Sequence, residues 1–168
     1  MLVNSTQLGG GSVEGRIKFA VEVARAVSAR IGAKKTGIRI SPGNPYNGIL
    51  EEGFEATYEA LIKALAELDL AYLHFMENPM QTGLLAKART WWKNTLIVNT
   101  FGGEKAKGKA DLEYSESGKA DLVSLGQLFV ANPDLVARLK NDGPFNTADA
   151  STFYGGGEKG YTDYPTLS

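Results

Sequence analysis

The chain has 168 residues, 43% of them hydrophobic and 22% charged, which is enough apolar material for one domain with a sizeable core. Eighteen basic and nineteen acidic residues give a formal charge of −1, which argues against a protein that binds nucleic acid or an anionic membrane through a basic surface. With no cysteine and a single histidine, we expect no disulfide and no metal site, and the composition fits a cytoplasmic protein.

No apolar run reaches the ~20 residues that a membrane-spanning helix needs, and residues 1–7 lack the layout of a signal peptide.

Strand-like and helix-like segments alternate along the chain. Ser12 is placed to cap a helix whose apolar stripe covers 17–27, and Gly32 ends it. A β-rich run over 36–40 follows, and the two prolines in 41–45 force a loop after it.

The same alternation continues through the middle of the chain. A helical stripe over 54–68 precedes a strand over 70–76, and a third helix over 84–92 precedes a strand over 95–99. The charged stretch 104–117 carries a weak apolar stripe, which we interpret as a helix.

A fourth strand is predicted over 120–125, and Asn132-Pro133 is typical of a helix N-cap followed by proline at the first helical position. From residue 141 the chain is rich in Gly, Asp, Thr and Tyr, which indicates an ordered tail. Strand starts spaced by about 25 to 35 residues suit β/α units of a parallel sheet. Two architectures remain open, a doubly wound sheet and half of a (βα)8 barrel.

Two polar residues interrupt the apolar strands. Arg39 must either be paired by a core carboxylate or point to a ligand, because a charge inside a strand cannot stay unsatisfied. In a barrel it would lie near the carboxyl end of its strand, where barrel active sites are built. His74, between Leu73 and Phe75, is interpreted as a hydrogen-bonded core histidine rather than a member of a catalytic triad.

Glycine-rich turns follow or precede several elements. Asn99, Thr100, Phe101 and Gly102 come directly after the third strand, and Gly126 follows the fourth. In barrels, backbone N–H groups of the turns after the last two strands commonly bind phosphate, although from these residues alone plain turn chemistry is the better explanation. The turn formed by residues 9–11 lacks the lysine of a P-loop and is interpreted as a simple turn.

Taken together, these segments resemble the old yellow enzymes, a family of FMN-dependent NAD(P)H:flavin oxidoreductases or ene-reductases. The resemblance covers nearly the whole chain and rests on six stretches: Gly10 to Arg16, Gly37 to Pro42, Tyr72 to His74, Gly126 to Val136, and the tail blocks Thr152 to Gly157 and Gly160 to Pro165. It implies that residues 1–168 form a single domain holding strands five to eight of a TIM (βα)8 barrel. The tail 141–168 would pack at the barrel mouth.

The resemblance also implies roles for individual residues. Arg39 would face the N1/C2-carbonyl edge of FMN, where a cation stabilises the anionic reduced flavin. Main-chain N–H groups from Asn99 to Gly102 and from Gly126 and Gln127 would hold the FMN phosphate. Phe153 would lie against the dimethylbenzene ring, with Tyr154 on the substrate side. NAD(P)H would donate the hydride, and an activated alkene would receive it.

Three features depart from the family pattern. Gln127 stands where the family has a phosphate-binding arginine, and Gly15 replaces an asparagine in the helix-start motif. The residues that the family carries on its first four strands have no counterpart here, so no catalytic residue can be identified in this chain. We therefore expect association with a complementary N-terminal half-barrel or with another copy of the chain. The alternative is a non-catalytic half-barrel that self-associates or binds a phosphorylated ligand.

Restoring the missing charge provides a test of the phosphate assignment. Gln127→Arg is expected to tighten FMN binding, because a charge-assisted hydrogen bond contributes roughly 1.5–3 kcal/mol. A fluorescence titration of FMN measures the change, and an unchanged affinity would show that the phosphate does not lie beside residue 127.

Overall fold

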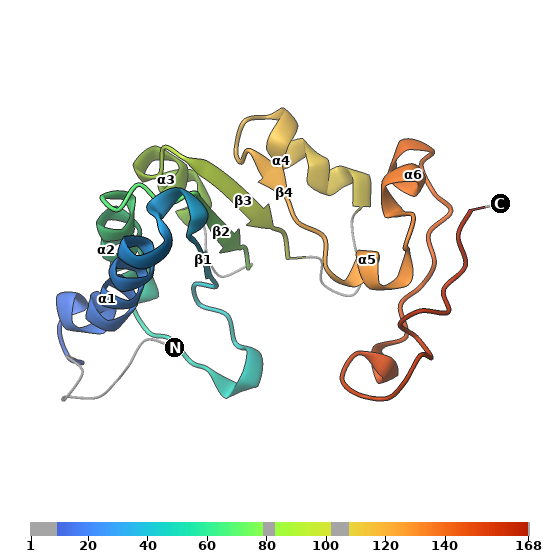
Figure 1. Ribbon diagram of the computed structural model, residues 1–168, viewed down its shortest axis with the longest axis horizontal. Coiled ribbons are helices and arrows are strands. Elements are labelled where there is room, and N and C mark those ends of the chain that lie inside the picture. The colour runs from blue at the N-terminus through green and yellow to red at the C-terminus, as the bar shows by residue number, and fades with distance from the viewer. Residues whose placement is uncertain (1–9, 79–82, 102–107, 168) are drawn as a thin grey trace. The chain divides into compact units, whose positions relative to one another are not determined.

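The computed structural model describes residues 10–78, 83–101 and 108–167, and these divide into two compact units. The first unit comprises Met1–Phe101 with Tyr114–Val123, and the second comprises Gly102–Glu113 with Ser124–Ser168. Each unit is described by itself. Figure 1 shows the helices and strands of both.

The first unit is built on a four-stranded parallel sheet in the order β1-β2-β3-β4. Its strands are β1 (Gly37–Ile40), β2 (Tyr72–Met76), β3 (Thr95–Asn99) and β4 (Leu122–Val123). Helices connect successive strands, as the alternating pattern requires of a parallel sheet. The register aligns Arg39 with His74, and Met76 with Asn99. The four parallel strands confirm the predicted β/α architecture.

Three helices pack against one face of this sheet: α1 (Val13–Ile31), α2 (Phe54–Ala66) and α3 (Leu84–Trp91) (Figure 1). The side chain of Ser12 accepts a hydrogen bond from the Gly15 N–H at 3.0 Å and Gly32 ends the helix, which confirms both predicted ends of α1. Short 3₁₀ helices lie at Ala33–Lys35 and Tyr46–Gly48. The core between sheet and helices contains fully buried residues of β2 and β3, namely Leu73, Phe75, Leu96 and Val98.

The opposite face of the sheet is not covered by helices of the first unit. Because side chains alternate along a strand, every second residue lies on this face. They include Arg39 on β1, Tyr72, His74 and Met76 on β2, Ile97 and Asn99 on β3, and Leu122 on β4. Tyr72 and Leu122 remain 39% and 53% exposed there. We call this surface the open face.

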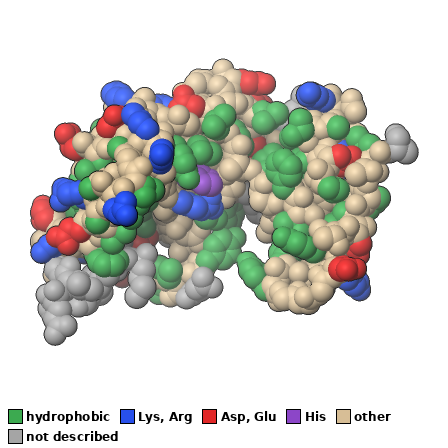
Figure 2. All heavy atoms as spheres, in the orientation of Figure 1, with side chains coloured by type: hydrophobic (Ala, Val, Ile, Leu, Met, Phe, Trp, Pro, Cys, Tyr) green, Lys and Arg blue, Asp and Glu red, His purple; other side chains and the backbone are tan. Residues whose placement is uncertain are grey.

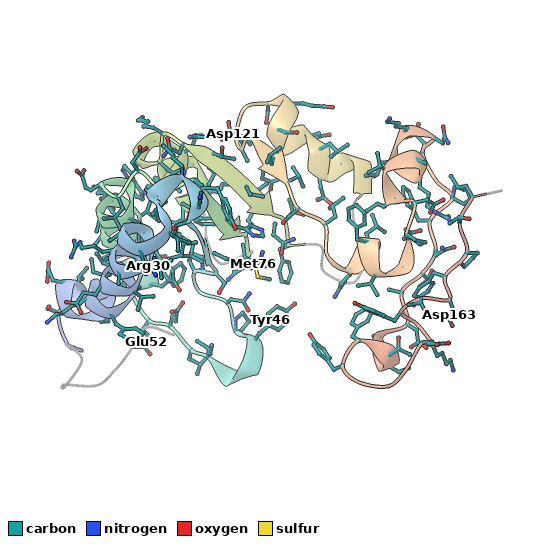
Figure 3. The ribbon with its side chains drawn as sticks, in the orientation of Figure 1. Arg30, Tyr46, Glu52, Met76, Asp121 and Asp163 are labelled. Atoms are coloured by element: carbon teal, nitrogen blue, oxygen red, sulfur yellow. The ribbon has the colours of Figure 1, made fainter. Side chains whose placement is uncertain are left out.

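The short strand β4 is held to β3 by hydrogen bonds that extend beyond its two residues. The N–H of Asp121 donates to the Leu96 carbonyl at 2.8 Å, and the Asp121 carboxylate accepts from the Leu96 N–H at 2.7 Å. Arg89 on α3 donates to the same carboxylate at 2.7 Å. The Leu96 N–H, followed by the Arg89 side chain, lowers the pKa of Asp121. Figure 3 labels Asp121 just before β4.

The second unit contains a 3₁₀ helix (Gly108–Leu112), α5 (Gln127–Ala131), α6 (Leu135–Lys140) and a 3₁₀ turn (Ala150–Thr152). The short helix α4 (Glu113–Glu116) begins at the last residue of the unit's first segment. None of the helices in the described ranges has both the length and the hydropathy to span a bilayer.

Three predicted elements differ in the structure. The strand expected over 120–125 is reduced to the two residues of β4. Of the helix expected over 104–117, residues 104–107 lie outside the described part, and the rest forms the 3₁₀ helix followed by α4. Asn132 does not cap the following helix; Asp134 occupies that position. The Asn132 side chain is instead fully buried, donating to the Leu128 carbonyl at 2.8 Å and accepting from the Asn146 N–H at 2.7 Å. Its amide therefore ties the tail to α5 rather than starting α6.

Candidate functional site

Arg39 joins three strands of the first unit across the open face. Its Nη1 lies 2.7 Å from Nε2 and 3.1 Å from Nδ1 of His74 on β2, and its Nη2 donates to Oδ1 of Asn99 on β3 at 2.9 Å. Partial burial lowers the pKa of Arg39. No carboxylate within the described ranges pairs with this guanidinium, so the alternative of a structural arginine held by a core carboxylate is not what the structure contains.

His74 is half-buried on the open face rather than inside the helix-covered core. It is hydrogen-bonded, as predicted, but its neighbour is a cation. Burial, and secondarily the charge of Arg39, lower its pKa below the ordinary value of 6.5. In Figure 2 the purple histidine atoms lie at the surface beside basic side-chain atoms.

The loops after β1 and β2 are fixed to one another at the carboxyl ends of the strands. The buried side chain of Asn78 donates to the carbonyls of Pro42 and Gly43 at 3.0 and 2.6 Å. Asn44 donates to the sulfur of Met76 at 3.1 Å, and Figure 3 labels Met76 at the end of β2. Two strand ends are therefore held in a defined arrangement beside Arg39, which is what a binding site on a parallel sheet requires.

The predicted phosphate-binding residues divide between the two units. Asn99 is the last residue of β3, and Thr100 and Phe101 follow it, all half-buried in the first unit. Gly102 lies outside the described residues. Asn99 uses its side-chain oxygen for Arg39, a contact that the sequence analysis did not anticipate.

Gly126 and Gln127 belong to the second unit, at the start of α5. Both are exposed, and a Cβ on Gly126 would meet no atom within 4 Å. The first N–H groups of a helix have no partner inside the helix, so those of this turn need a partner from outside α5. Arginine is absent here, and the Gln127 amide supplies hydrogen bonds without charge.

Phe153 and Tyr154 lie in the tail of the second unit. Phe153 is half-buried directly after the 3₁₀ turn, whereas Tyr154 is 97% exposed. Asp149 caps this turn by accepting from the Ser151 N–H at 3.0 Å and the Ser151 hydroxyl at 2.6 Å. The hydrogen bond from the Ser151 hydroxyl, followed by that from the Ser151 N–H, lowers the pKa of Asp149.

The tail is anchored by Arg138, a residue that the sequence analysis did not single out. This side chain is 3% exposed, and its Nε donates to Asp134 at 2.6 Å. Its two terminal nitrogens donate to the carbonyls of Pro144 and Pro165, the latter at 2.7 Å. The pairing with Asp134 four residues earlier can be recognised in the sequence, but the bonds to the Pro144 and Pro165 carbonyls cannot, because main-chain acceptors leave no sequence pattern.

The open face of the first unit thus offers a guanidinium, an imidazole and an amide, which suit the oxygen and nitrogen atoms at the edge of a planar ligand. The second unit, taken by itself, offers the exposed start of α5 and the exposed ring of Tyr154. No group of acidic, histidine or cysteine residues that could hold a metal ion occurs within residues 10–78, 83–101 and 108–167.

Comparison with known proteins gives a family match over most of the chain. Residues 4–146 match the NADH:flavin oxidoreductase / NADH oxidase family. Chanoclavine-I aldehyde reductase from Penicillium roqueforti is 37% identical over 170 residues, covering 95% of this chain and 46% of that protein. A probable flavin mononucleotide-dependent alkene reductase from Leishmania infantum is 36% identical over 158 residues, covering 94% of this chain and 43% of that protein.

Solved structures agree with the sequence matches. Morphinone reductase in complex with tetrahydroNAD superposes with a TM-score of 0.85 at 37% identity, over 98% of this chain and 44% of that one. An old yellow enzyme homologue from Zymomonas mobilis superposes with a TM-score of 0.83 at 31% identity, over 94% of this chain and 46% of that one. The fold is therefore part of a TIM barrel, and the chain spans less than half the length of these relatives.

Arg138 allows a direct test of what holds the tail. Arg138→Met is expected to lower the free energy of unfolding by about 3 kcal/mol, because it removes charged hydrogen bonds to buried partners. Denaturant unfolding measures the loss, and limited proteolysis should cut faster within residues 144–167. Lys140→Met, on an exposed residue of the same helix, is the control and should change stability little. Equal stability of both variants would contradict the anchoring role.

Proposed function

Because the chain belongs to the NADH:flavin oxidoreductase / NADH oxidase family, we propose that it is the FMN-binding half of an old yellow enzyme-type ene-reductase, with NAD(P)H as hydride donor. The observation that carries this proposal is Arg39, a guanidinium on the open face beside fixed strand ends, with no carboxylate among the described residues to neutralise it. We place the activity in the cytoplasm, which the cysteine-free composition fits.

The residues present fit FMN by the chemistry of their donors. The hydrogen bonds to His74 and Asn99 use two of the five N–H donors of the guanidinium. The others suit the carbonyl and ring nitrogen of a flavin edge. A Cβ added to Gly126 would meet no atom within 4 Å, so this turn leaves room for a phosphate to approach.

Within this assignment each residue has a limited task. FMN, when bound, supplies hydride transfer from NAD(P)H and on to the β-carbon of an activated alkene. Arg39 would bind the pyrimidine edge and place positive charge there. Main-chain groups of Thr100, Phe101, Gly102, Gly126 and Gln127 would bind the phosphate. Phe153 would cover the dimethylbenzene ring, and Tyr154 would lie on the substrate side.

No residue of this sequence can be matched to the family's substrate-binding pair or to its tyrosine proton donor, so we assign no proton donor within it. Among the described residues, the sheet ends at β1 and β4, each paired on one side only, and unpaired strand edges bind other strands. We therefore propose that activity requires further β/α units, whether joined to this sequence or supplied by a separate polypeptide.

The surface of α1 supports the same conclusion. Four apolar side chains at every fourth position are 40 to 50% exposed: Phe19, Val23, Val27 and Ile31. Residues spaced by four lie on one side of a helix, next to the stripe that packs on α2. We call this row the α1 ridge. A helix of the missing units, laid beside α1, would remove the ridge from water.

FMN binding and reduction test the proposed function. The chain is expected to quench FMN fluorescence, and Arg39→Gln should weaken binding about tenfold, because it removes a charged donor. Arg30→Gln, on the exposed end of α1, should leave the affinity unchanged. Together with a complementary half, the flavin absorption band should be bleached by NAD(P)H. FMN binding without bleaching would favour the non-catalytic alternative. If FMN fluorescence stays unchanged in every mixture, the proposal is contradicted.

The α1 ridge makes the partner proposal testable. The half of morphinone reductase that this chain does not match should form a one-to-one complex with it, measured by light scattering after size exclusion. Val23→Glu should weaken the complex by roughly tenfold or more, because a carboxylate would be buried. Arg25→Glu puts the same charge on the opposite side of α1 and is the control. A homodimer that the added half does not displace would contradict this assignment.

A further inference from the structure

We propose that His74 is a positioning residue for Arg39: its neutral imidazole accepts a hydrogen bond from the guanidinium and fixes it on the open face. The consequence for flavin binding rests on the proposed function above. The contact itself belongs to the protein and can be tested without a ligand.

His74 lies on β2, between β1, which carries Arg39, and β3, which carries Asn99. Arg39 and His74 are direct partners in the parallel register of β1 and β2. The guanidinium extends over β2 to reach Asn99 on β3, so it passes the imidazole on its way. With Nη1 at His74 and Nη2 at Asn99, the guanidinium is held at two points, and this fixes the direction of its plane.

The contact requires a neutral imidazole. A guanidinium has only donors, so the ring must accept, and a doubly protonated ring has no lone pair left. Nη1 lies within hydrogen-bond distance of both ring nitrogens, 2.7 Å from Nε2 and 3.1 Å from Nδ1, so whichever nitrogen carries no proton is the acceptor. Protonation of His74 would turn the acceptor into a donor and place two cations beside each other.

The surroundings of His74 keep it in that state at neutral pH. Arg39 faces it from β1, Ile97 is its register partner on β3, and the open-face neighbours on β2 are Tyr72 and Met76. Of these groups Arg39 alone is charged. Partial burial and this charge both lower the pKa of His74, so the contact persists above the ordinary value of 6.5 and is lost as the pH falls through the lowered value.

The consequence is that Arg39 would be ordered for its ligand before the ligand arrives. A long arginine side chain loses rotamer freedom when it binds, and a side chain already fixed by neighbours loses less. His74 and Asn99 would thus raise the affinity for a flavin edge without touching the flavin. Acidification should weaken FMN binding, because it releases Arg39.

The first experiment follows the imidazole of the chain by proton NMR during a pH titration. Since the chain has one histidine, its ring signals need no assignment by mutation. We expect a midpoint below 6.5, which moves upward in Arg39→Gln and stays in place in Arg30→Gln. An ordinary midpoint that ignores Arg39→Gln would overturn the proposal.

The second experiment compares two substitutions of His74 by FMN titration above and below that midpoint. Gln retains an acceptor without titrating, whereas Leu has a similar size and no acceptor. His74→Leu should bind FMN about tenfold more weakly than the natural chain above the midpoint, and its affinity should not fall further below it. His74→Gln should match the natural chain above the midpoint and keep its affinity below it, where the natural chain weakens. Circular dichroism checks that both variants fold.

The two experiments separate the possible failures. If His74→Leu binds FMN as tightly as the natural chain, the positioning role is wrong even though the proposed function stands. If no form of the chain binds FMN, alone or with a complementary half, the proposed function fails. The NMR titration then still decides whether His74 holds Arg39.

Discussion

Burial of only one face of the parallel sheet is the constraint on which the first unit depends. Helices α1, α2 and α3 cover one face and take Leu73, Phe75, Leu96 and Val98 out of water, so strand alternation assigns the remaining residues to the open face. A charged residue on β1 can only lie there. It meets the polar residues that β2 and β3 place on the same side, because parallel strands in register bring corresponding positions together.

The same constraint explains why this half is both a binding surface and an incomplete one. The open face carries Arg39, His74 and Asn99 at the end of the sheet where the loops are fixed by Asn78, but also Tyr72 and Leu122, whose apolar surface remains in contact with water. In a closed barrel the inner face is packed with side chains from all strands. The proposed function assigns the polar end to the ligand and the apolar end to closure of the barrel. The proposed partner contact gives the α1 ridge a corresponding role on the outside of the sheet.

Elements that depend on neighbouring residues were predicted correctly, whereas contacts that depend on residues far along the chain were not. The helix ends at Ser12 and Gly32 and the strand over 95–99 agree with the prediction, because capping and apolar alternation act over a few residues. Asn132 was misassigned because its amide is used by Asn146 in the tail. Of the candidate site residues, Arg39 was recognised from its position in an apolar strand, whereas its partners were not, since His74 and Asn99 are 35 and 60 residues away along the chain.

The sequence by itself determined the order and type of the β/α units, the family resemblance and the presence of one charge inside a strand, because these depend on residue periodicity and motif identity. Only the tertiary structure decided what that charge touches: an imidazole and an amide rather than a carboxylate. It also decided that Arg138, not a motif residue, holds the tail. The physical reason is register, since the hydrogen-bond partners of a side chain on a parallel sheet are set by strands that the chain reaches only after a helix.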